Sequence, residues 1–242
     1  RYMQLKSTKT LRNRQAELQQ VSSEKRYDSV NQIASVQVKD LSIEYPSGEK
    51  IAYPDFVLNE GDKVLLTGDS GTGKSTLMKA MLGQIKPKTG EVLYLDKSGK
   101  RLHPDLRKLG YLAQDLLIFP GSIADNITMF NSKFNTKANN LVEQMAFEDD
   151  QARFDDGLNT QLDPHRELLS GGQQQKVVLM RLLLHQTPVL YLDEATSAID
   201  QKATTMILRN LMKTNATLLM IAHNLTPEQK ALFDREIYLE GK

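Results

Sequence analysis

Hydrophobic and polar residues alternate after residue 34, in the manner of a β-strand. The apolar positions there are Val36, Val38, Leu41, Ile43 and Tyr45. Alternation of this kind puts apolar side chains on one face of an extended chain, so we predict a strand over residues 35–45. A turn containing Pro46 and Gly48 follows, and a second strand is expected over 51–58. Residues 63–67 are then a short apolar run of the kind found in buried strands.

The pattern becomes helical further along the chain. Residues 74–85 carry apolar side chains on one face and predict a helix, and short strands are expected at 91–95 and 109–113. From residue 122 to about 169 the composition is polar and helical, which predicts a helical insertion. The remaining expected elements are a mostly buried helix at 172–185, apolar strands at 189–192 and 217–222, and a helix between these strands that starts near Asp200.

The first thirty residues differ in charge from the rest of the chain. They hold seven Lys or Arg and three Asp or Glu, a net charge of +4, which leaves −3 for the remainder of a chain whose total is +1. Residues 1–26 contain no Gly or Pro and predict a polar helix. It is either a surface helix or a frayed terminus, or else the cytosolic end of a membrane-spanning helix that begins upstream. The last alternative fits because Lys and Arg are enriched on the cytoplasmic side.

Bulk composition narrows the protein class. The chain has 242 residues, with 40% hydrophobic and 25% charged residues, which is typical of a soluble globular protein. It has no cysteine, which excludes disulfides, thiolate metal sites and cysteine nucleophiles. No apolar stretch approaches the roughly 18–20 residues that span a bilayer. The net charge gives no reason to expect a nucleic-acid partner.

Residues 68–76, with the sequence GDSGTGKST, match the P-loop pattern. A predicted strand precedes them and a predicted helix follows, which is the context that a P-loop requires. The backbone N–H groups of such a loop converge on an anion at the start of a helix. The expected nucleotide-binding residues are Gly68, Asp69, Ser70, Gly71, Thr72, Gly73, Lys74, Ser75 and Thr76. Lys74 would face the β- and γ-phosphates and Ser75 would offer its hydroxyl to Mg²⁺, whereas the alternative is a glycine-rich turn without a ligand.

Two acids follow the apolar strand at 189–192. Asp193 closes the strand, as the Mg²⁺-facing acid of a P-loop enzyme does, and Glu194 beside it is in a position to polarise an attacking water. The alternative is a solvated pair of surface acids. Four consecutive apolar residues before the pair, together with the P-loop upstream, favour the functional interpretation.

A second glycine-rich turn, Ser170-Gly171-Gly172-Gln173, precedes the helix expected at 172–185. A hydroxyl residue followed three positions later by Gln is a capping box, so the turn is expected to cap this helix. A helix start of this kind also exposes N–H groups that can bind a phosphate. Local physical chemistry leaves both interpretations open.

Taken together, these motifs resemble the nucleotide-binding domain of ABC transporters. The ordered set consists of residues 68–76, Gln114, residues 169–173, residues 190–194, residues 197–200 and His223, and the resemblance covers about residues 31–242. It implies an α/β fold with a P-loop NTPase core, an antiparallel β subdomain and a helical subdomain at about 115–186. It also implies ATP and Mg²⁺ as ligands.

The resemblance further implies a head-to-tail dimer, homomeric or heteromeric. Each ATP would lie between the P-loop of one subunit and the turn of Ser170, Gly171, Gly172 and Gln173 of the other. Asp200 would couple the two sites, and Tyr45 would stack on adenine.

The remaining roles concern the reaction itself. By the same likeness, Glu194 would be the general base, His223 would contact the γ-phosphate, and Gln114 would sense Mg²⁺ and the attacking water. Ser75, Gln114 and Asp193 would then surround the metal.

Residues 119–127 are similar to a segment of exporters in which the membrane and ATPase domains share one chain. With residues 1–30 as a basic linker, this implies a transmembrane domain on the same full-length chain and a location at the cytoplasmic face of the cell membrane. The sequence departs from those exporters at residues 163–167 and at Gln174, where a glycine-rich stretch and a basic residue are common.

Two other functions fit the sequence less well. Soluble ABC-type ATPases of translation or DNA repair usually have tandem ATPase domains or long coiled coils, and this sequence shows neither. Regulatory binding modules tend to lose the glutamate or the lysine, whereas this chain keeps Glu194 and Lys74. We therefore expect hydrolysis of MgATP that switches a membrane domain between conformations, with ATP closing the dimer and hydrolysis releasing it.

Overall fold

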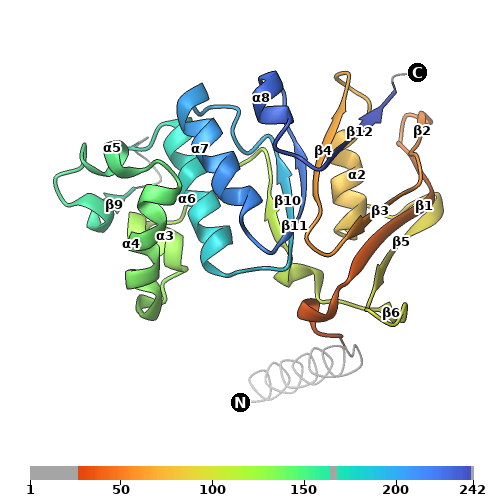
Figure 1. Cartoon of the computed structure of the whole chain (residues 1–242), viewed down its shortest axis with the longest axis horizontal. Helices are drawn as coiled ribbons and strands as arrows, with labels where there is room; N and C mark the ends of the chain where they lie inside the picture. The colour runs from red at the N-terminus through yellow and green to blue at the C-terminus, as the bar shows by residue number, and fades with distance from the viewer. Residues whose placement is uncertain (1–26, 164–167, 241–242) are drawn as a thin grey trace, which may run out of the picture.

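The computed structural model describes residues 27–163 and 168–240, which form two sheets and a helical lobe (Figure 1). The helix predicted over residues 1–26 and most of the segment 163–167 lie outside the described residues. In Figure 1 the helical lobe lies at one end of the molecule and the antiparallel sheet at the other, with the parallel sheet between them.

The antiparallel sheet is built around β1 (Ser35–Glu44). Its other strands are β2 (Lys50–Ala52), β3 (Phe56–Asn59), β5 (Thr89–Leu95) and β6 (Arg101–Leu102). β1 pairs with the first three of these strands, and β6 extends the sheet beyond β5. The strand predicted at 35–45 is confirmed apart from its last residue.

A bulge explains why the apolar positions of β1 change parity along the strand. Val36 and Val38 have even numbers and Leu41 and Ile43 have odd numbers, yet all four are buried. The pairing with β5 shifts between Lys39 and Ser42. One extra residue in a strand returns the following side chains to the original face, so both pairs reach the same core.

The single strand predicted at 51–58 is wrong, because this segment forms two strands. β2 pairs with the end of β1 and β3 pairs with its beginning. Pro54 lies between them and has no N–H for a ladder hydrogen bond. Tyr53, beside it, is buried.

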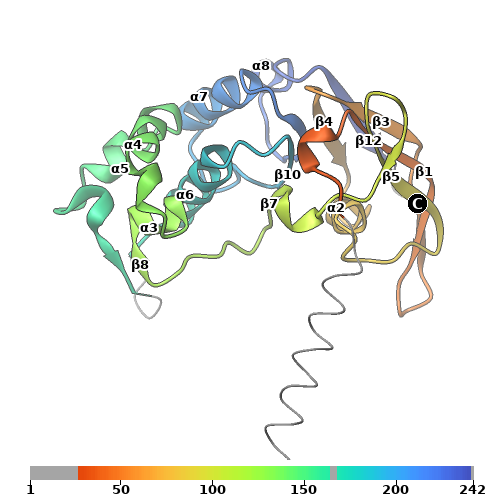
Figure 2. The ribbon, with the colours of Figure 1, turned by 90° about the horizontal axis from the view of Figure 1, so that it is seen from below.

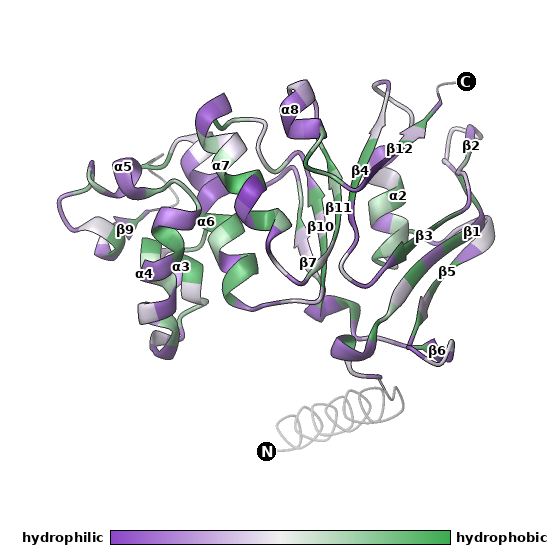
Figure 3. Cartoon of the chain, in the orientation of Figure 1, coloured by the Kyte–Doolittle hydropathy of each residue, from purple (hydrophilic) through white to green (hydrophobic). Residues whose placement is uncertain are grey.

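The parallel sheet has the order β12-β4-β11-β10-β7. Its strands are β12 (Arg235–Leu239), β4 (Lys63–Gly68), β11 (Thr217–Ile221), β10 (Val189–Asp193) and β7 (Gly110–Leu112). All residues of β10 and β11 are buried, as expected for strands covered on both faces. Figure 3 shows the hydrophobic colouring of these two strands.

The helix α2 (Lys74–Met81) lies between the two sheets (Figure 1). Leu77, Met78 and Met81 pack in one core with residues of both sheets. The helix is shorter than the predicted 74–85 because Leu82 is its C-cap and Gly83 follows with a φ of 66°. A left-handed glycine at this point ends a helix.

The predicted helical insertion contains α3 (Ile123–Thr128), α4 (Asn135–Gln144) and the short α5 (Glu148–Gln151). These helices lie against α6 (Gly171–Leu184) on the far side of the parallel sheet from the antiparallel sheet (Figure 2). The short strands β8 (Gly121–Ser122) and β9 (Gln161–Leu162) pair at the base of the insertion.

The remaining helices follow β10 and β11. α7 (Gln201–Met212) begins where it was predicted, with Asp200 as N-cap, and α8 (Pro227–Lys230) is a single turn. Short 3₁₀ turns lie at Val30–Gln32, Leu106–Lys108, Ser132–Phe134 and Gly157–Asn159. Among the described residues, no helix has the length and apolar character needed to cross a membrane.

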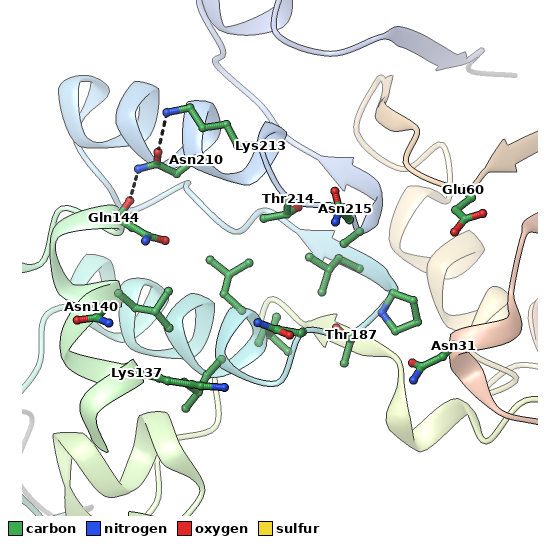
Figure 4. Close-up of a pocket in the computed structure, with 18 residues that line it drawn as sticks. Asn31, Glu60, Lys137, Asn140, Gln144, Thr187, Asn210, Lys213, Thr214 and Asn215 are labelled. Atoms are coloured by element: carbon green, nitrogen blue, oxygen red, sulfur yellow. Dashed lines mark hydrogen bonds between the residues drawn. The ribbon is translucent and has the colours of Figure 1, made fainter. Parts of the chain in front are cut away.

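A cavity of about 730 Å³ lies between the helical lobe and the parallel sheet. Figure 4 shows Lys137, Asn140 and Gln144 of α4 on one side and Asn210 and Lys213, at the end of α7, on another. Pro188 and Ala216, which also line it, immediately precede β10 and β11. The cavity therefore lies at the amino ends of these strands, opposite the edge at which the predicted chemistry is found.

Candidate functional site

Four strands of the parallel sheet bring the predicted site residues to one edge. Asp193 pairs with Ile221, Ile221 with Leu66, and Leu192 with Leu112. The carboxyl ends of β4, β10, β11 and β7 therefore lie side by side. The P-loop, Glu194, His223 and Gln114 follow these ends directly, and ligands of open α/β sheets bind at such an edge.

The P-loop turns through left-handed backbone at Gly73, which has a φ of 84° and is the N-cap of α2. A Cβ atom at this position would lie 2.6 Å from the Tyr53 hydroxyl oxygen. That hydroxyl donates a hydrogen bond of 3.1 Å to the Gly73 carbonyl oxygen. Burial raises the pKa of Tyr53 well above its usual range, which keeps the hydroxyl protonated as a donor. Tyr53 therefore supports the loop from beneath, a role that the sequence did not predict.

The side chain of Lys74 lies inside the loop. Its amine donates to the Gly68 carbonyl at 2.8 Å and to the Asp69 carbonyl at 2.7 Å. Thr72 donates its hydroxyl to the Asp69 carbonyl at 2.9 Å and braces the same turn. Because an ammonium group has three donors, Lys74 keeps one for an anion held in the loop. The buried amine is thus oriented by the backbone that surrounds it.

Asp193 lies next to the start of α2. Its side chain is 3% exposed, and it is hydrogen bonded to the side chain of Ser75. Burial raises the pKa of Asp193, the Ser75 hydrogen bond opposes this rise, and the neighbouring Glu194 carboxylate reinforces it. A buried carboxylate with such an environment is stabilised by a nearby cation.

The set of oxygen atoms at Ser75 and Asp193 fits Mg²⁺. This ion takes one or two protein ligands and completes its shell with phosphate and water oxygens. In the described part of the chain, no group of three or more His, Cys, Asp or Glu could hold a metal by itself. A divalent ion at Asp193 would therefore share its shell with a phosphate-bearing ligand.

Glu194 has an unusual backbone conformation with a φ of 55°. Residues other than glycine rarely adopt it, and it costs about 1–3 kcal/mol when the surroundings enforce it. The Glu194 N–H donates to the Ile221 carbonyl at 3.0 Å. The turn directs the carboxylate toward His223, whose Nε2 lies 3.4 Å from Glu194 Oε1. Both side chains are partly exposed, so a small molecule can reach this pair.

Tyr45 and Gln114 border the same region. The Tyr45 hydroxyl lies 2.7 Å from the Thr76 hydroxyl, which places the ring beside the P-loop helix. Gln114 is exposed and follows β7 by two residues.

The turn at residues 170–173 caps α6 as predicted. Ser170 accepts from the Gln173 N–H at 3.3 Å, and Gln173 Oε1 accepts from the Ser170 N–H at 2.8 Å. Gln173 Nε2 also donates to Asp150 at 3.1 Å, which ties the turn to α5. Ser170 and Gly171 are exposed. No hydrogen bond between described residues joins this turn to the P-loop.

The last predicted residue, Asp200, has a local role in this structure. Its carboxylate accepts from the Ala203 N–H at 2.9 Å and caps α7. The side chain is exposed beside the turn that follows β10.

Sequence reasoning missed Gln175, which is buried on α6. Its side chain is hydrogen bonded to the segment that follows β10. Gln175 is the last of three consecutive glutamines at the start of α6 and is followed by Lys176, so nothing in the sequence distinguished it. Its partners lie about twenty residues away, and no local pattern identifies them.

Comparisons with known proteins agree with this geometry. A family model described as ABC transporter matches residues 53–197. The lactococcin-A transport/processing ATP-binding protein of Lactococcus lactis subsp. lactis is 32% identical over 79% of this chain and 28% of its own length. The mesentericin-Y105 transport/processing ATP-binding protein of Leuconostoc mesenteroides is 35% identical over 72% of this chain and 25% of its own length.

A solved structure is also similar. It is that of a bacterial Atm1-family ABC exporter with ATP bound, with a TM-score of 0.74 and 27% identity over 86% of this chain and 37% of that one. The chain thus spans about a quarter of the length of each of the two curated relatives above.

Proposed function

The chain belongs to the ABC transporter family as an ATP-binding ATPase domain of the exporter type, and from this premise we propose that two such domains enclose MgATP and drive a membrane domain. The observation that carries the proposal is the edge of the parallel sheet. There the Lys74 amine, the hydrogen-bonded pair of Ser75 and Asp193, and the pair of Glu194 and His223 come together.

ATP enters with its phosphates in the P-loop, made by residues 68–76. The Lys74 amine and the backbone N–H groups at the start of α2 bind the anionic oxygens. Tyr45 stacks on the adenine ring. Its position beside Thr76 supports this role because the hydroxyl contact fixes the ring at the border of the loop.

Ser75 and Asp193 would hold Mg²⁺, with Gln114 next to it. When bound, this ion neutralises negative charge on the phosphate oxygens. Asp193 suits the task because burial raises the cost of its uncompensated charge. Gln114 contributes an uncharged group at the end of the neighbouring strand.

Glu194 acts as the general base. Its carboxylate orients a water molecule and accepts a proton from it, and this kind of assistance contributes typically about 10²–10⁴-fold to a rate. His223 lies against Glu194 Oε1 and contacts the γ-phosphate. The left-handed backbone at Glu194 supports these roles, since enforced conformations of this kind cluster at functional sites.

The site is completed by a second domain, identical or homologous, in a head-to-tail dimer. Ser170 and Gly171 are exposed, and the capped helix start of α6 offers N–H groups to a phosphate bound to the partner's P-loop. Gly172 and Gln173 belong to the same turn, and Asp200 communicates between the two sites.

The membrane partner docks on the surface formed by the segment between β7 and α3 and by the residues that follow α3. Leu117, Met129 and Phe130 are exposed there, at 60%, 43% and 56%. Phe119 lies edge-on to Phe130 with 6.4 Å between ring centroids, and Arg181 covers Phe119 at 5.3 Å. An apolar patch of this kind marks a protein contact.

The partner is a transmembrane domain on the same full-length chain. The small share of the relatives' length that this chain spans supports this arrangement, as do the basic residues 1–30, which we propose as the linker. The ATP-binding domain, over about residues 31–242 with its helical part at about 115–186, then lies at the cytoplasmic face of the cell membrane.

The test is the solution mass of the Glu194→Gln variant with and without MgATP. Because this variant lacks the general base but still binds MgATP, it is expected to form a stable ATP-dependent dimer. Addition of Ser170→Arg, which fills the exposed turn with a bulky cation, is expected to abolish the dimer while nucleotide binding to the monomer remains. A Glu194→Gln chain that binds MgATP and stays monomeric contradicts the composite site.

A further inference from the structure

Gln175 makes all of its side-chain hydrogen bonds to one short segment. Its Nε2 donates to the Glu194 carbonyl at 3.0 Å and to the Ser197 hydroxyl at 2.9 Å. Its Oε1 accepts from the Ala198 N–H at 3.0 Å. The residue is 7% exposed, so both amide protons and the amide oxygen are satisfied inside the protein. The segment 194–198 is therefore held at three points by one side chain.

Ala195 and Thr196 of this segment are buried, and its backbone makes further hydrogen bonds at Glu194, Thr196 and Ser197. It leaves the parallel sheet after β10, and the Glu194 N–H is bound to Ile221 as its last link to β11. Within the turn, the Ser197 N–H donates to the Glu194 carbonyl at 3.1 Å. Gln175 donates to the same carbonyl. The left-handed peptide at Glu194 is thus fixed on one side by Ile221 and on the other by Gln175.

The start of α6 packs against the same segment. A Cβ atom at Gly172 would lie 2.5 Å from the Ala198 carbonyl oxygen, so only glycine allows this approach. Gln175 is one turn further along the same helix. The exposed turn at Ser170 is therefore connected to the backbone of Glu194 through the first turn of α6 and the side-chain amide of Gln175.

We propose that Gln175 is a positioning residue that couples the Ser170 turn to Glu194 within one subunit. The inference rests on the proposed function and deepens it. A phosphate that engages the Ser170 turn displaces the start of α6, and Gln175 transmits this displacement to the Glu194 carbonyl. Glu194 of one subunit is then positioned by the contact between the Ser170 turn of the same subunit and the nucleotide bound at the partner's P-loop.

The proposed coupling depends on the hydrogen bonds of the Gln175 side chain and not on the volume that this side chain fills. A substitution that keeps the volume can therefore distinguish coupling from packing. Gln175→Met keeps the length and much of the shape of the side chain and removes all three hydrogen bonds. Thr217→Val is the matched control. Thr217 is 5% exposed, and its hydroxyl binds the Gly61 N–H and the Asn59 carbonyl at the opposite end of the sheet.

The experiment measures steady-state hydrolysis and equilibrium MgATP binding for the unmodified chain and both variants. Gln175→Met is expected to lower kcat by about 10- to 100-fold, because small misplacements of a catalytic group have effects of this size. The affinity for MgATP is expected to stay within twofold. Thr217→Val is expected to lower the melting temperature by about as much as Gln175→Met does, but without changing kcat.

A double-mutant cycle supplies the decisive readout. If Gln175 acts through Glu194, then Gln175→Met lowers the residual rate of Glu194→Gln by less than twofold, because residues that act as a unit are not additive. A further loss of tenfold or more in the Glu194→Gln background overturns the proposal, and so does unchanged kcat in Gln175→Met alone. Absence of turnover in the unmodified chain instead counts against the proposed function, so the two failures are distinguishable.

Discussion

Substitution of Gly172 by alanine is expected to destabilise the chain, whereas the same change at Gly171 is not. The two glycines are adjacent in the first turn of α6. A Cβ atom at Gly172 would approach the Ala198 carbonyl oxygen to 2.5 Å and its carbonyl carbon to 3.3 Å. At Gly171 the nearest atom would be the Ala198 Cβ at 3.4 Å, an ordinary contact.

A small movement of the neighbouring residues cannot relieve the clash at Gly172. Ala198 cannot move away freely, because its N–H is bound to Gln175 Oε1. Forced overpacking typically costs about 1–3 kcal/mol, while the gain in helix propensity from glycine to alanine is at most about 1 kcal/mol. Because the 2.5 Å approach is to a backbone oxygen, the cost lies in the upper part of this range, at about 2–3 kcal/mol. The net loss at Gly172 is therefore about 1–2 kcal/mol after the gain in helix propensity, whereas Gly171→Ala is neutral or slightly stabilising.

The assay is thermal unfolding followed by circular dichroism. For a chain of this length, 1 kcal/mol shifts Tm by roughly 2–4 °C. Gly172→Ala is thus expected to melt about 2–8 °C below the unmodified chain and Gly171→Ala at or slightly above it. Equal melting temperatures for the two variants would refute the close approach of α6 to Ala198.

Two further predictions concern the P-loop edge. Lys74→Ala removes the buried amine and is expected to weaken MgATP binding about 10- to 100-fold. This factor corresponds to the loss of a charge-assisted hydrogen bond of roughly 1.5–3 kcal/mol. An unchanged affinity in a nucleotide titration would contradict the role of Lys74. Because burial raises the pKa of Asp193 above its usual value of 3.8, ionisation in the folded state costs stability as pH rises from that value through the folded pKa. Without metal, the Asp193→Asn variant should therefore have a higher Tm than the unmodified chain at pH 7, and the difference should vanish near pH 3. A lower Tm of the variant at pH 7 would show that the charge of Asp193 is already compensated.

Local sequence signals predicted the parts of the fold that depend on neighbours in the chain. The P-loop, the capping box at Ser170 and the helix that starts near Asp200 each involve residues within a few positions of one another. The buried strands β10 and β11 were also predicted, because strands covered on both faces are continuous apolar runs.

The elements that sequence analysis missed depend on distant partners. β12 has polar and charged residues among its five, and it is a strand because it pairs with β4, about 170 residues earlier. The division of residues 51–58 into two strands reflects separate pairing with the two ends of β1. Gln175 has partners that only the folded chain brings within reach, so its contribution could not be derived from its neighbours.

The pairing of β8 with β9 brings the two ends of the helical insertion together. Gly121 lies opposite Leu162 and Ser122 opposite Gln161, so the chain leaves and re-enters the rest of the molecule through adjacent positions. The intervening stretch, with α3, α4 and α5, can therefore be exchanged as a block between homologous genes by crossovers at these two points. Recombination of this kind preserves the path of the parallel sheet and varies only the lobe, provided that the exchanged block keeps its apolar surface toward α6 and Asp150, which binds Gln173 and Lys176.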